Sequence, residues 1–226
     1  SPNYWGGSRP GSNVYGNSLV ALDIRTGKYR WHQQTVHHDL WDVDMPTAGP
    51  LIDVTVGGRK VPAIANVSKS SLFFVFDRKT GKPVLPIEER AVPKGDVPGE
   101  YYHPTQPFPV NTPPLSRVSM TKADIVTAAD TTPEHAAACQ AMWDKAGGFY
   151  NAGQYTPFLF HAEGAAPRST IQFPGGIGGV NWGGPAADPT TGWVYVNALD
   201  TSLVGWTEKV PAGAKSYSFD AKVADA

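Results

Sequence analysis

The sequence predicts an all-β protein built from the four-stranded antiparallel blades of a β-propeller. The segments LVALDIRTGKYRW (19–31) and LFFVFDRKTGKPV (72–84) both have an apolar run, then Asp, two residues and Thr-Gly-Lys. Their Asp residues are 54 positions apart, and a period of about 50 residues is typical of propeller blades. The 24 glycines and 21 prolines cluster between apolar runs, which favours many short strands joined by turns.

Each Asp-x-x-Thr-Gly segment predicts a hairpin. The carboxylates of Asp23 and Asp77 can accept hydrogen bonds from N–H groups of the turn, and Gly27 and Gly81 can adopt the left-handed conformation that closes it. Such turns join hairpins in many β proteins. Two unrelated hairpins are therefore the alternative to a repeated blade.

One complete blade is expected between the two motifs and just after the second. GPLIDVTV, KVPAIANV and SLFFVFD are apolar, β-branched runs separated by polar turns, and a fourth strand should follow the second Thr-Gly-Lys. A further blade begins within NWGGPAADPTTGWVYVNAL, residues 181–199, where an Asp-Pro-Thr-Thr-Gly turn precedes alternating valines.

The segment between these blades fits the pattern less well. It is rich in proline at first and then contains TPEHAAACQAMWDKAG, which predicts a short helix from near Thr132 to Gly147. We therefore expect one partial propeller domain over residues 1–226, with an insertion of loops and a short helix at about 87–170.

Composition excludes several classes of protein. With 19 basic and 20 acidic side chains, the chain lacks the charge that nucleic-acid binding requires. Its single cysteine, Cys139, excludes an internal disulfide framework. The sequence has no long apolar run and no signal-like start, and it opens with Ser1, so we expect a processed or excised piece of a longer protein.

Ionisable side chains concentrate in HHDLWDVDMP, residues 37–46. Lys69 falls in the turn between the second and third strands. Because alternate loops of a strand meander share a face, the loop with Asp39, Asp42 and Asp44 should lie on the same face as Lys69. Asn181 and Trp182, just before the later blade, would join that face. Both Thr-Gly-Lys turns would lie on the opposite one.

Each of these side chains also has a simpler explanation. Asp42 and Asp44 could share a hard cation such as calcium or magnesium, or be solvated loop acids. Lys69 could donate to a carbonyl or carboxylate, or be a surface charge. Trp182 could lie against a flat cofactor, or pack in the core. Asp39 could cap a turn.

Four segments together resemble a known family. ALDIRTGKYRWHQQTVHHDLWDVDMP, FVFDRKTGKPVLPIEERAVP, PTQPF and GGVNWGGPAADP occur in the order found in quinoprotein dehydrogenases that use pyrroloquinoline quinone, and they are most similar to the glucose and polyol branch. The resemblance implies an eight-bladed propeller with the quinone at the centre of one face, beside calcium or magnesium and less expectedly a lanthanide. This chain would supply about half of that propeller.

The resemblance also implies roles for individual residues. Asp42 matches the catalytic aspartate that takes the substrate hydroxyl proton as hydride moves to the quinone, and Lys69 matches the lysine that donates to the quinone oxygens. Asn181 and Trp182 match the cofactor-contact region. Asp42 and Asp44 are the candidate metal ligands.

The repeat motif itself resembles the tryptophan-docking motif of the family. Trp31 would pack between neighbouring blades, whereas the second repeat has Leu85 at the corresponding position. That second docking contact is therefore expected to be absent or replaced.

The implied protein is a periplasmic dehydrogenase that oxidises a sugar, polyol or alcohol and passes electrons to ubiquinone or a cytochrome c. It would need the remaining blades or a partner chain, and this chain alone should be inactive. A protein-binding scaffold propeller and a degenerate quinoprotein are the alternatives. The scaffold has no need for Asp42, Lys69 and Asn181 on one face.

Overall fold

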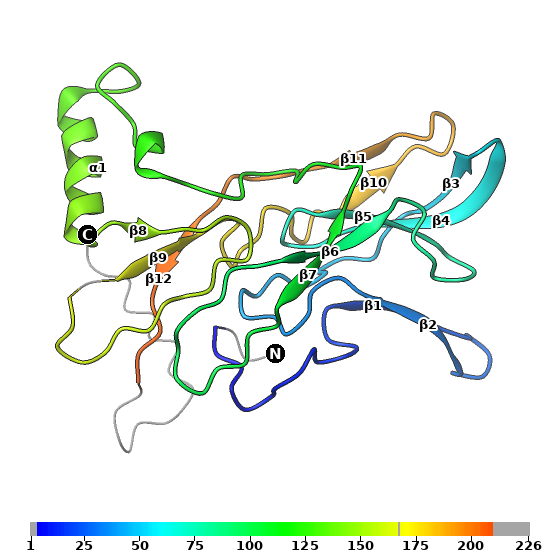
Figure 1. The fold of residues 1–226 in the computed structure, drawn as a ribbon. Helices are drawn as coiled ribbons and strands as arrows, with labels where there is room; N and C mark the ends of the chain where they lie inside the picture. Colours follow the sequence, from blue (N-terminus) through cyan, green and yellow to red (C-terminus); the bar gives the residue numbers. More distant parts are fainter. Residues whose placement is uncertain (1–3, 167, 210–226) are drawn as a thin grey trace.

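A computed structural model of the chain describes residues 4–166 and 168–209 as a set of short strands with little helix (Figure 1). The strands are β1 (Ser18–Leu22), β2 (Tyr29–Gln34), β3 (Leu51–Val56), β4 (Arg59–Val67), β5 (Phe73–Asp77), β6 (Ile87–Ala91), β7 (Thr105–Pro109), β8 (Phe149–Tyr150), β9 (Ser169–Gln172), β10 (Pro185–Ala187), β11 (Val194–Val196) and β12 (Leu203–Gly205). The helices are the 3₁₀ turn η1 (Lys122–Asp124) and α1 (Pro133–Lys145).

The strands form five small sheets. β3, β4 and β5 make an antiparallel meander, and β1–β2, β6–β7 and β10–β11 are antiparallel pairs. The fifth sheet has the order β12-β9-β8, with β8 parallel to β9. Small antiparallel sheets of this kind are the architecture that the sequence predicted.

The main core lies between β5 and the loop that follows β2. Phe74 and Phe76 of β5 pack into it, and their rings stack 6.0 Å apart. Val75 points to the other face of β5, against Ala63 and Ala65 of β4. The core cluster contains Val36, Leu40, Trp41, Val43, Leu72, Phe74, Phe76 and Tyr155. Half of these residues come from the loop, which is therefore an integral part of the core.

Both predicted Asp-x-x-Thr-Gly hairpin turns are confirmed. One carboxylate oxygen of Asp23 accepts hydrogen bonds from two backbone N–H groups of its turn, and Asp77 does the same in the second turn. Gly27 and Gly81 have φ of 68° and 73°, the left-handed conformation that favours glycine. The two motifs therefore form matching turns, as expected for a repeat.

Trp31 connects the first hairpin to the β3-β4-β5 sheet. Its indole Nε1 donates to the backbone oxygen of Arg78 at 3.2 Å. A Cβ placed on Gly81 would lie 2.7 Å from indole Cδ2, so the ring rests directly on the second turn. This is the packing between neighbouring blades that the resemblance implied. Leu85, at the corresponding position of the second repeat, packs instead against the Ala63, Ala65 and Val75 cluster.

The prediction of a full fourth strand after the second Thr-Gly-Lys is wrong. Pro83 makes only an isolated bridge to Phe76, and Val84 N–H donates to the Val75 oxygen. Pro83 and Pro86 have no N–H to donate, which prevents a continuous ladder. The chain instead continues into β6, which pairs with β7.

The predicted helix is confirmed as α1. Thr132 is its N-cap and accepts a hydrogen bond from His135 N–H, Pro133 stands at the first helical position, and Gly147 follows the helix with φ of 73°. The helix lies at one end of the molecule (Figure 1). Neither helix in the described residues has the length and apolarity needed to cross a bilayer.

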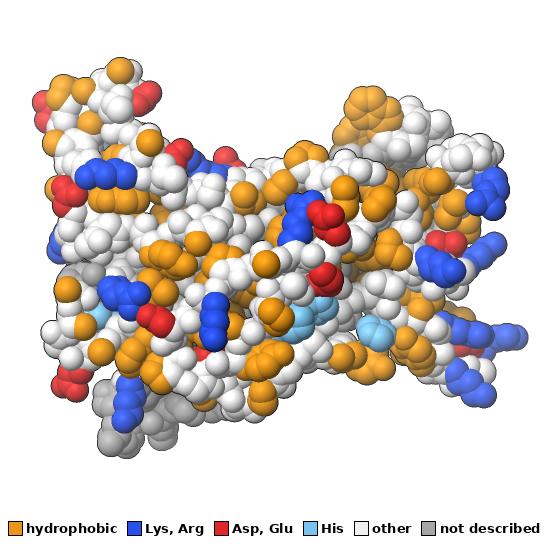
Figure 2. Space-filling view, in the orientation of Figure 1, with side chains coloured by type: hydrophobic (Ala, Val, Ile, Leu, Met, Phe, Trp, Pro, Cys, Tyr) orange, Lys and Arg blue, Asp and Glu red, His pale blue; other side chains and the backbone are white. Residues whose placement is uncertain are grey.

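The opposite end of the molecule carries the β1–β2 and β3–β4 turns. Lys and Arg side chains gather there on the face shown in Figure 2. These turns are therefore solvated and basic. The acidic loop between β2 and β3 is spatially separate from them, because it begins at the other end of β2.

Two matched glycine substitutions test the Trp31 contact. Ala at either Gly27 or Gly81 must adopt a left-handed conformation, at a cost of about 1–2 kcal/mol. At Gly27 the new Cβ meets nothing within 4 Å, whereas at Gly81 it collides with the Trp31 indole. We expect Gly81→Ala to lower the free energy of unfolding of the full-length protein by about 1–3 kcal/mol more than Gly27→Ala, as measured by denaturant unfolding. Equal losses would contradict the docking contact.

Candidate functional site

The loop between β2 and β3 presents Asp42 at the surface by burying its neighbours. Trp41 is 5% exposed and Val43 2%, and the Trp41 indole donates to the backbone oxygen of Thr156 at 3.0 Å. Asp42 itself has φ of 61°, a conformation that side-chain-bearing residues rarely adopt. Its side chain is 33% exposed. The two buried anchors thus hold an outward-facing carboxylate between them.

Asp39 caps this loop from inside. Its Oδ1 accepts from Trp41 N–H at 2.8 Å, and its Oδ2 accepts from Val43 N–H at 3.1 Å and from the Asn17 side-chain amide at 2.7 Å. Burial raises the pKa of the Asp39 carboxyl, although the Trp41 amide and the Asn17 side chain oppose that shift. The turn-capping alternative for Asp39 is confirmed.

Lys69 joins the loop from the β4–β5 turn. Its Nζ lies 3.1 Å from Asp42 Oδ2 and 2.7 Å from Asp44 Oδ1, and only 11% of its side chain is exposed. The Lys69 backbone N–H also donates to the backbone oxygen of Asp44 at 2.9 Å. The predicted convergence of Asp42, Asp44 and Lys69 on one face is therefore confirmed, and Lys69 is no isolated surface charge.

The charge state of Lys69 follows from its two acidic partners. Burial alone would lower the pKa of the ammonium, but the hydrogen bonds and charges of Asp44 and Asp42 outweigh it and leave the pKa of Lys69 above its usual value. Lys69 is therefore a cation at neutral pH, and it faces two carboxylates.

A second loop, residues 177–184, packs against Lys69. Gly179 N–H donates to the Lys69 backbone oxygen at 3.0 Å. A Cβ at Gly178 would lie 2.6 Å from Lys69 Cβ, so the two backbones are in close contact at a position with φ of 85°. Through Gly178 and Gly179 the loop that carries Asn181 and Trp182 adjoins Lys69. We use the name rim for the cluster of Asp42, Asp44 and Lys69 together with this adjoining loop, residues 177–184.

Asn181 and Trp182 present unused binding groups. Asn181 Nδ2 donates to the Ile177 oxygen at 2.6 Å, while its Oδ1 is buried and accepts no hydrogen bond within the described residues. Trp182 is 82% exposed, so it does not pack in the core formed by the described residues. The loop therefore offers one buried acceptor and one open aromatic surface.

The metal role of Asp42 and Asp44 stays a prediction. Their carboxylates are of the type that calcium and magnesium bind, but Lys69 contacts both of them. In the part of the chain that the structure describes, no three His, Cys, Asp or Glu side chains are grouped as a metal site. The rim could therefore provide two carboxylates of a larger coordination shell.

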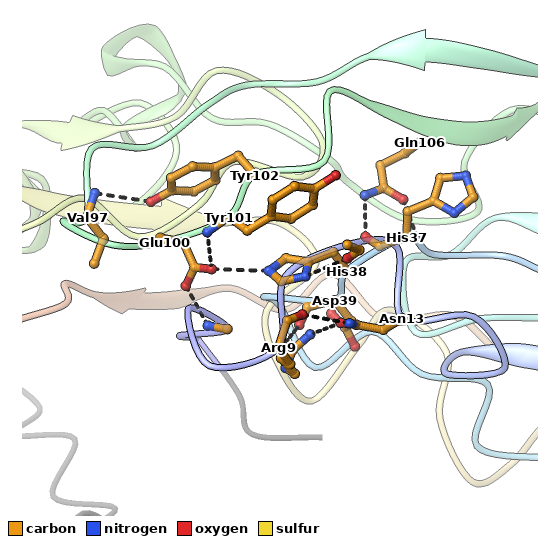
Figure 3. A network of polar contacts seen from close by, with 12 residues as sticks. Arg9, Asn13, His37, His38, Asp39, Val97, Glu100, Tyr101, Tyr102 and Gln106 are labelled. Atoms are coloured by element: carbon orange, nitrogen blue, oxygen red, sulfur yellow. Dashed lines mark hydrogen bonds and ion pairs between the residues drawn. The ribbon is translucent and has the colours of Figure 1, made fainter.

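Sequence reasoning missed a buried polar network around His38 and Glu100 (Figure 3). His38 Nε2 lies 3.1 Å from Glu100 Oε1, and both side chains are almost fully buried. Glu100 Oε2 accepts from Gly6 N–H at 2.5 Å, and Gln106 binds the backbone N–H and oxygen of His37 at 2.7 Å each. The adjacent histidines were the signal that the sequence offered, and Glu100 and Gln106 lie more than sixty positions after them.

Tyr4 is a second missed residue, and it lies near the rim. Burial raises the pKa of its phenol, the charge of Asp42 raises it further, and Lys69 lowers it. Its ring packs edge-on against Phe158 at 5.1 Å. Nothing in the spacing of the sequence pointed to Tyr4, because a single tyrosine near the start of a chain carries no pattern.

Comparison with a protein-family model gives a match over almost the whole chain. Residues 1–224 match the model described as "PQQ: Glucose/ethanol/alcohol dehydrogenase, beta-propeller domain". The chain is also 36% identical over 217 residues to the quinoprotein glucose dehydrogenase of Escherichia coli, covering 94% of this chain and 25% of that protein. It is 36% identical over 205 residues to the quinate/shikimate dehydrogenase (quinone) of Acinetobacter baylyi, covering 90% and 24%.

Among solved structures, a europium-containing methanol dehydrogenase has a similar fold. It aligns with a TM-score of 0.56 and 21% identity, over 93% of this chain and 28% of that one. This likeness supports the propeller fold alone. The chain spans about a quarter of the length of the curated relatives described above.

The environment of Lys69 predicts its reactivity. Because the pKa of Lys69 is raised and its side chain is mostly buried, little neutral amine is available to an acylating reagent. In pulse labelling of the full-length protein at pH 9, read by mass spectrometry, Lys69 should be acylated more slowly than the exposed Lys79. Asp44→Asn removes the nearer carboxylate and should speed labelling of Lys69 without changing Lys79. An unchanged Lys69 rate would contradict the ion pair.

Proposed function

The chain belongs to the β-propeller family of quinoprotein glucose, ethanol and alcohol dehydrogenases, and on that premise we propose that it carries part of the active site of a dehydrogenase that oxidises a hydroxyl group of a sugar or polyol. The observation that carries the proposal is the contact of Lys69 Nζ with Asp42 at 3.1 Å, on a rim that also contains an unsatisfied acceptor and an open indole.

Asp42 is the proposed general base. Its carboxylate is partly exposed and is held by a loop whose neighbouring residues are buried. A fixed carboxylate that reaches solvent can accept the proton of a bound substrate hydroxyl, and general bases of this kind accelerate reactions by about 10²–10⁴-fold. Because Asp42 is fixed before substrate binds, little reorganisation is needed at the moment of transfer.

The remaining rim residues have the chemistry to hold pyrroloquinoline quinone. This cofactor supplies, when bound, the carbonyl that accepts the hydride. Lys69 would donate to its oxygens as a cation, the Oδ1 of Asn181 would accept from a polar group, and the exposed indole of Trp182 would lie against its flat ring system. The unsatisfied Asn181 oxygen supports this assignment because buried acceptors without partners are uncommon.

Asp42 and Asp44 are the proposed protein ligands of a divalent metal ion. Calcium or magnesium suits two carboxylates best, and a lanthanide is the less expected ion. The Lys69 ammonium contacts both carboxylates, and a bound metal ion would compete with it for their oxygens. The metal would supply positive charge that stabilises an oxyanion at the rim.

Likeness to the family supports our proposal for the physiological setting. The substrate is a sugar or polyol. One relative is named for glucose, which is a sugar, and another for quinate and shikimate, which carry several hydroxyl groups on a ring. The electron acceptor is ubiquinone or a cytochrome c, and the location is the periplasm. The remaining blades, or a partner chain, would complete the site.

Replacement of Asp42 tests the chemistry. In the full-length protein, Asp42→Asn should lower kcat by about 100- to 10,000-fold, because the amide cannot accept the hydroxyl proton, while the quinone still binds. Asp53→Asn is the control. Asp53 lies on β3, outside the rim, and its carboxylate pairs with Arg78. Steady-state kinetics and quinone absorbance after gel filtration give the two readouts. Near-normal turnover of Asp42→Asn would remove Asp42 from the mechanism.

Replacement of Trp182 tests the cofactor surface. Trp182→Ala removes an 82% exposed side chain, so the free energy of unfolding of the cofactor-free protein should change by less than about 0.5 kcal/mol. Affinity for pyrroloquinoline quinone, measured by absorbance titration, should fall by about tenfold because an aromatic contact is lost. Trp182→Phe keeps a flat ring and should retain most of the affinity. Equal affinity of Trp182→Ala and the parent would exclude stacking.

A further inference from the structure

We propose that Asp39 is a positioning residue: its buried carboxylate holds the peptide N–H groups on both sides of Asp42 and so fixes the Asp42 side chain toward Lys69. The inference rests on the proposed role of Asp42 as general base. It assigns to Asp39 a part in catalysis through Asp42, and no contact of its own with substrate or cofactor.

The two hydrogen bonds act at the correct places for this role. Asp39 Oδ1 accepts from Trp41 N–H at 2.8 Å and Oδ2 from Val43 N–H at 3.1 Å. Between these two amides the backbone of Asp42 has φ of 61°, which a residue with a side chain rarely adopts without local support. Releasing the two amides would therefore let the backbone at Asp42 relax, and its carboxylate would turn away from the Lys69 ammonium.

Two side chains from the first segment of the chain hold Asp39 itself. The Asn17 side chain donates to Oδ2 at 2.7 Å, and Arg9 Nη2 donates to the Asp39 backbone oxygen at 2.5 Å. Arg9 in turn bonds the Asn13 side chain. Figure 3 shows Arg9 and Asn13 beside Asp39, with His38 above them. The segment that contains residues 9–17 thus holds the carboxylate of Asp39 through Asn17 and its backbone oxygen through Arg9.

Comparison with the other capping aspartates of this chain distinguishes positioning from simple turn formation. Asp77 also caps a turn through two backbone N–H groups, but its turn is on the surface at the far end of β5. Asp39 also accepts from two backbone N–H groups, but only 7% of the residue is exposed. A buried carboxylate is a costly way to close a turn, and in this loop it lies directly beneath the proposed base.

The experiment compares Asp39→Asn with Asp77→Asn in the full-length protein loaded with pyrroloquinoline quinone and calcium. Asp39→Asn replaces the oxygen that accepts from Val43 N–H with an NH₂ donor. Asp77→Asn also removes the charge of a capping carboxylate, but it keeps the single oxygen that accepts both backbone bonds of its turn. For each variant we would measure kcat and KM, cofactor retention, and hydrogen exchange of the peptide that spans residues 40–44 in the cofactor-free protein. The exchange measurement reports on the loop whether or not the enzyme turns over.

Asp39→Asn should speed exchange at residues 40–44 and lower kcat by about 100-fold, the size of effect expected when a reacting group is displaced by about 1 Å. KM and cofactor retention should change little, and Asp77→Asn should leave both exchange at 40–44 and kcat unchanged. Unchanged exchange in Asp39→Asn, or faster exchange with unchanged kcat, would overturn the inference.

A double variant separates the amide contacts from the Asn17 contact. Asn17→Asp combined with Asp39→Asn exchanges the two partners, which restores a hydrogen bond between positions 17 and 39 but places an amide where Val43 N–H needs an acceptor. We expect kcat to stay low. Recovery of kcat would show that the Asn17 pair alone matters, and would overturn the inference. The role of Asp42 is judged separately, by Asp42→Asn.

Discussion

The burial of Trp41 and Val43 on either side of Asp42 is the constraint on which the site depends. These two side chains lie in the core and fix the loop, so the side chain of Asp42 between them points outward. The same burial removes two peptide N–H groups from water, so a nearby acceptor is needed. The Asp39 carboxylate is that acceptor. Burial of the two apolar side chains therefore requires a buried carboxylate beside them.

The second half of the rim depends on strand topology. The β4–β5 turn returns the chain beside the acidic loop, and the bond from Lys69 N–H to the Asp44 oxygen joins the two backbones. The loop at 177–184 then binds the Lys69 backbone oxygen through Gly179. Lys69 therefore has both of its backbone groups engaged, one by each neighbouring loop. The backbone of Lys69 is therefore fixed in position, and only the methylene groups of its side chain can change conformation.

The sequence predicted the parts of this arrangement that depend on local patterns. The Thr-Gly turns, the helix after Thr132 and the shared face of Asp42 and Lys69 follow from capping chemistry, periodicity and the alternation of loops in a meander. Contacts between distant segments have no such pattern, so the bonds of His38 with Glu100 and of Gly6 with Glu100 were not predictable. The missing fourth strand reflects prolines whose effect depends on which N–H groups a neighbouring strand requires.

The charges of the rim favour a further cation. Two carboxylates around one ammonium leave a net negative charge, which attracts a further positive charge. The backbone bond between Lys69 and Asp44 does not involve either side chain. If a metal ion took a share of the carboxylate oxygens, the Lys69 stem could adjust while both backbones kept their positions. The ammonium would then be directed to another acceptor at the rim, which is the role proposed for it toward the quinone oxygens.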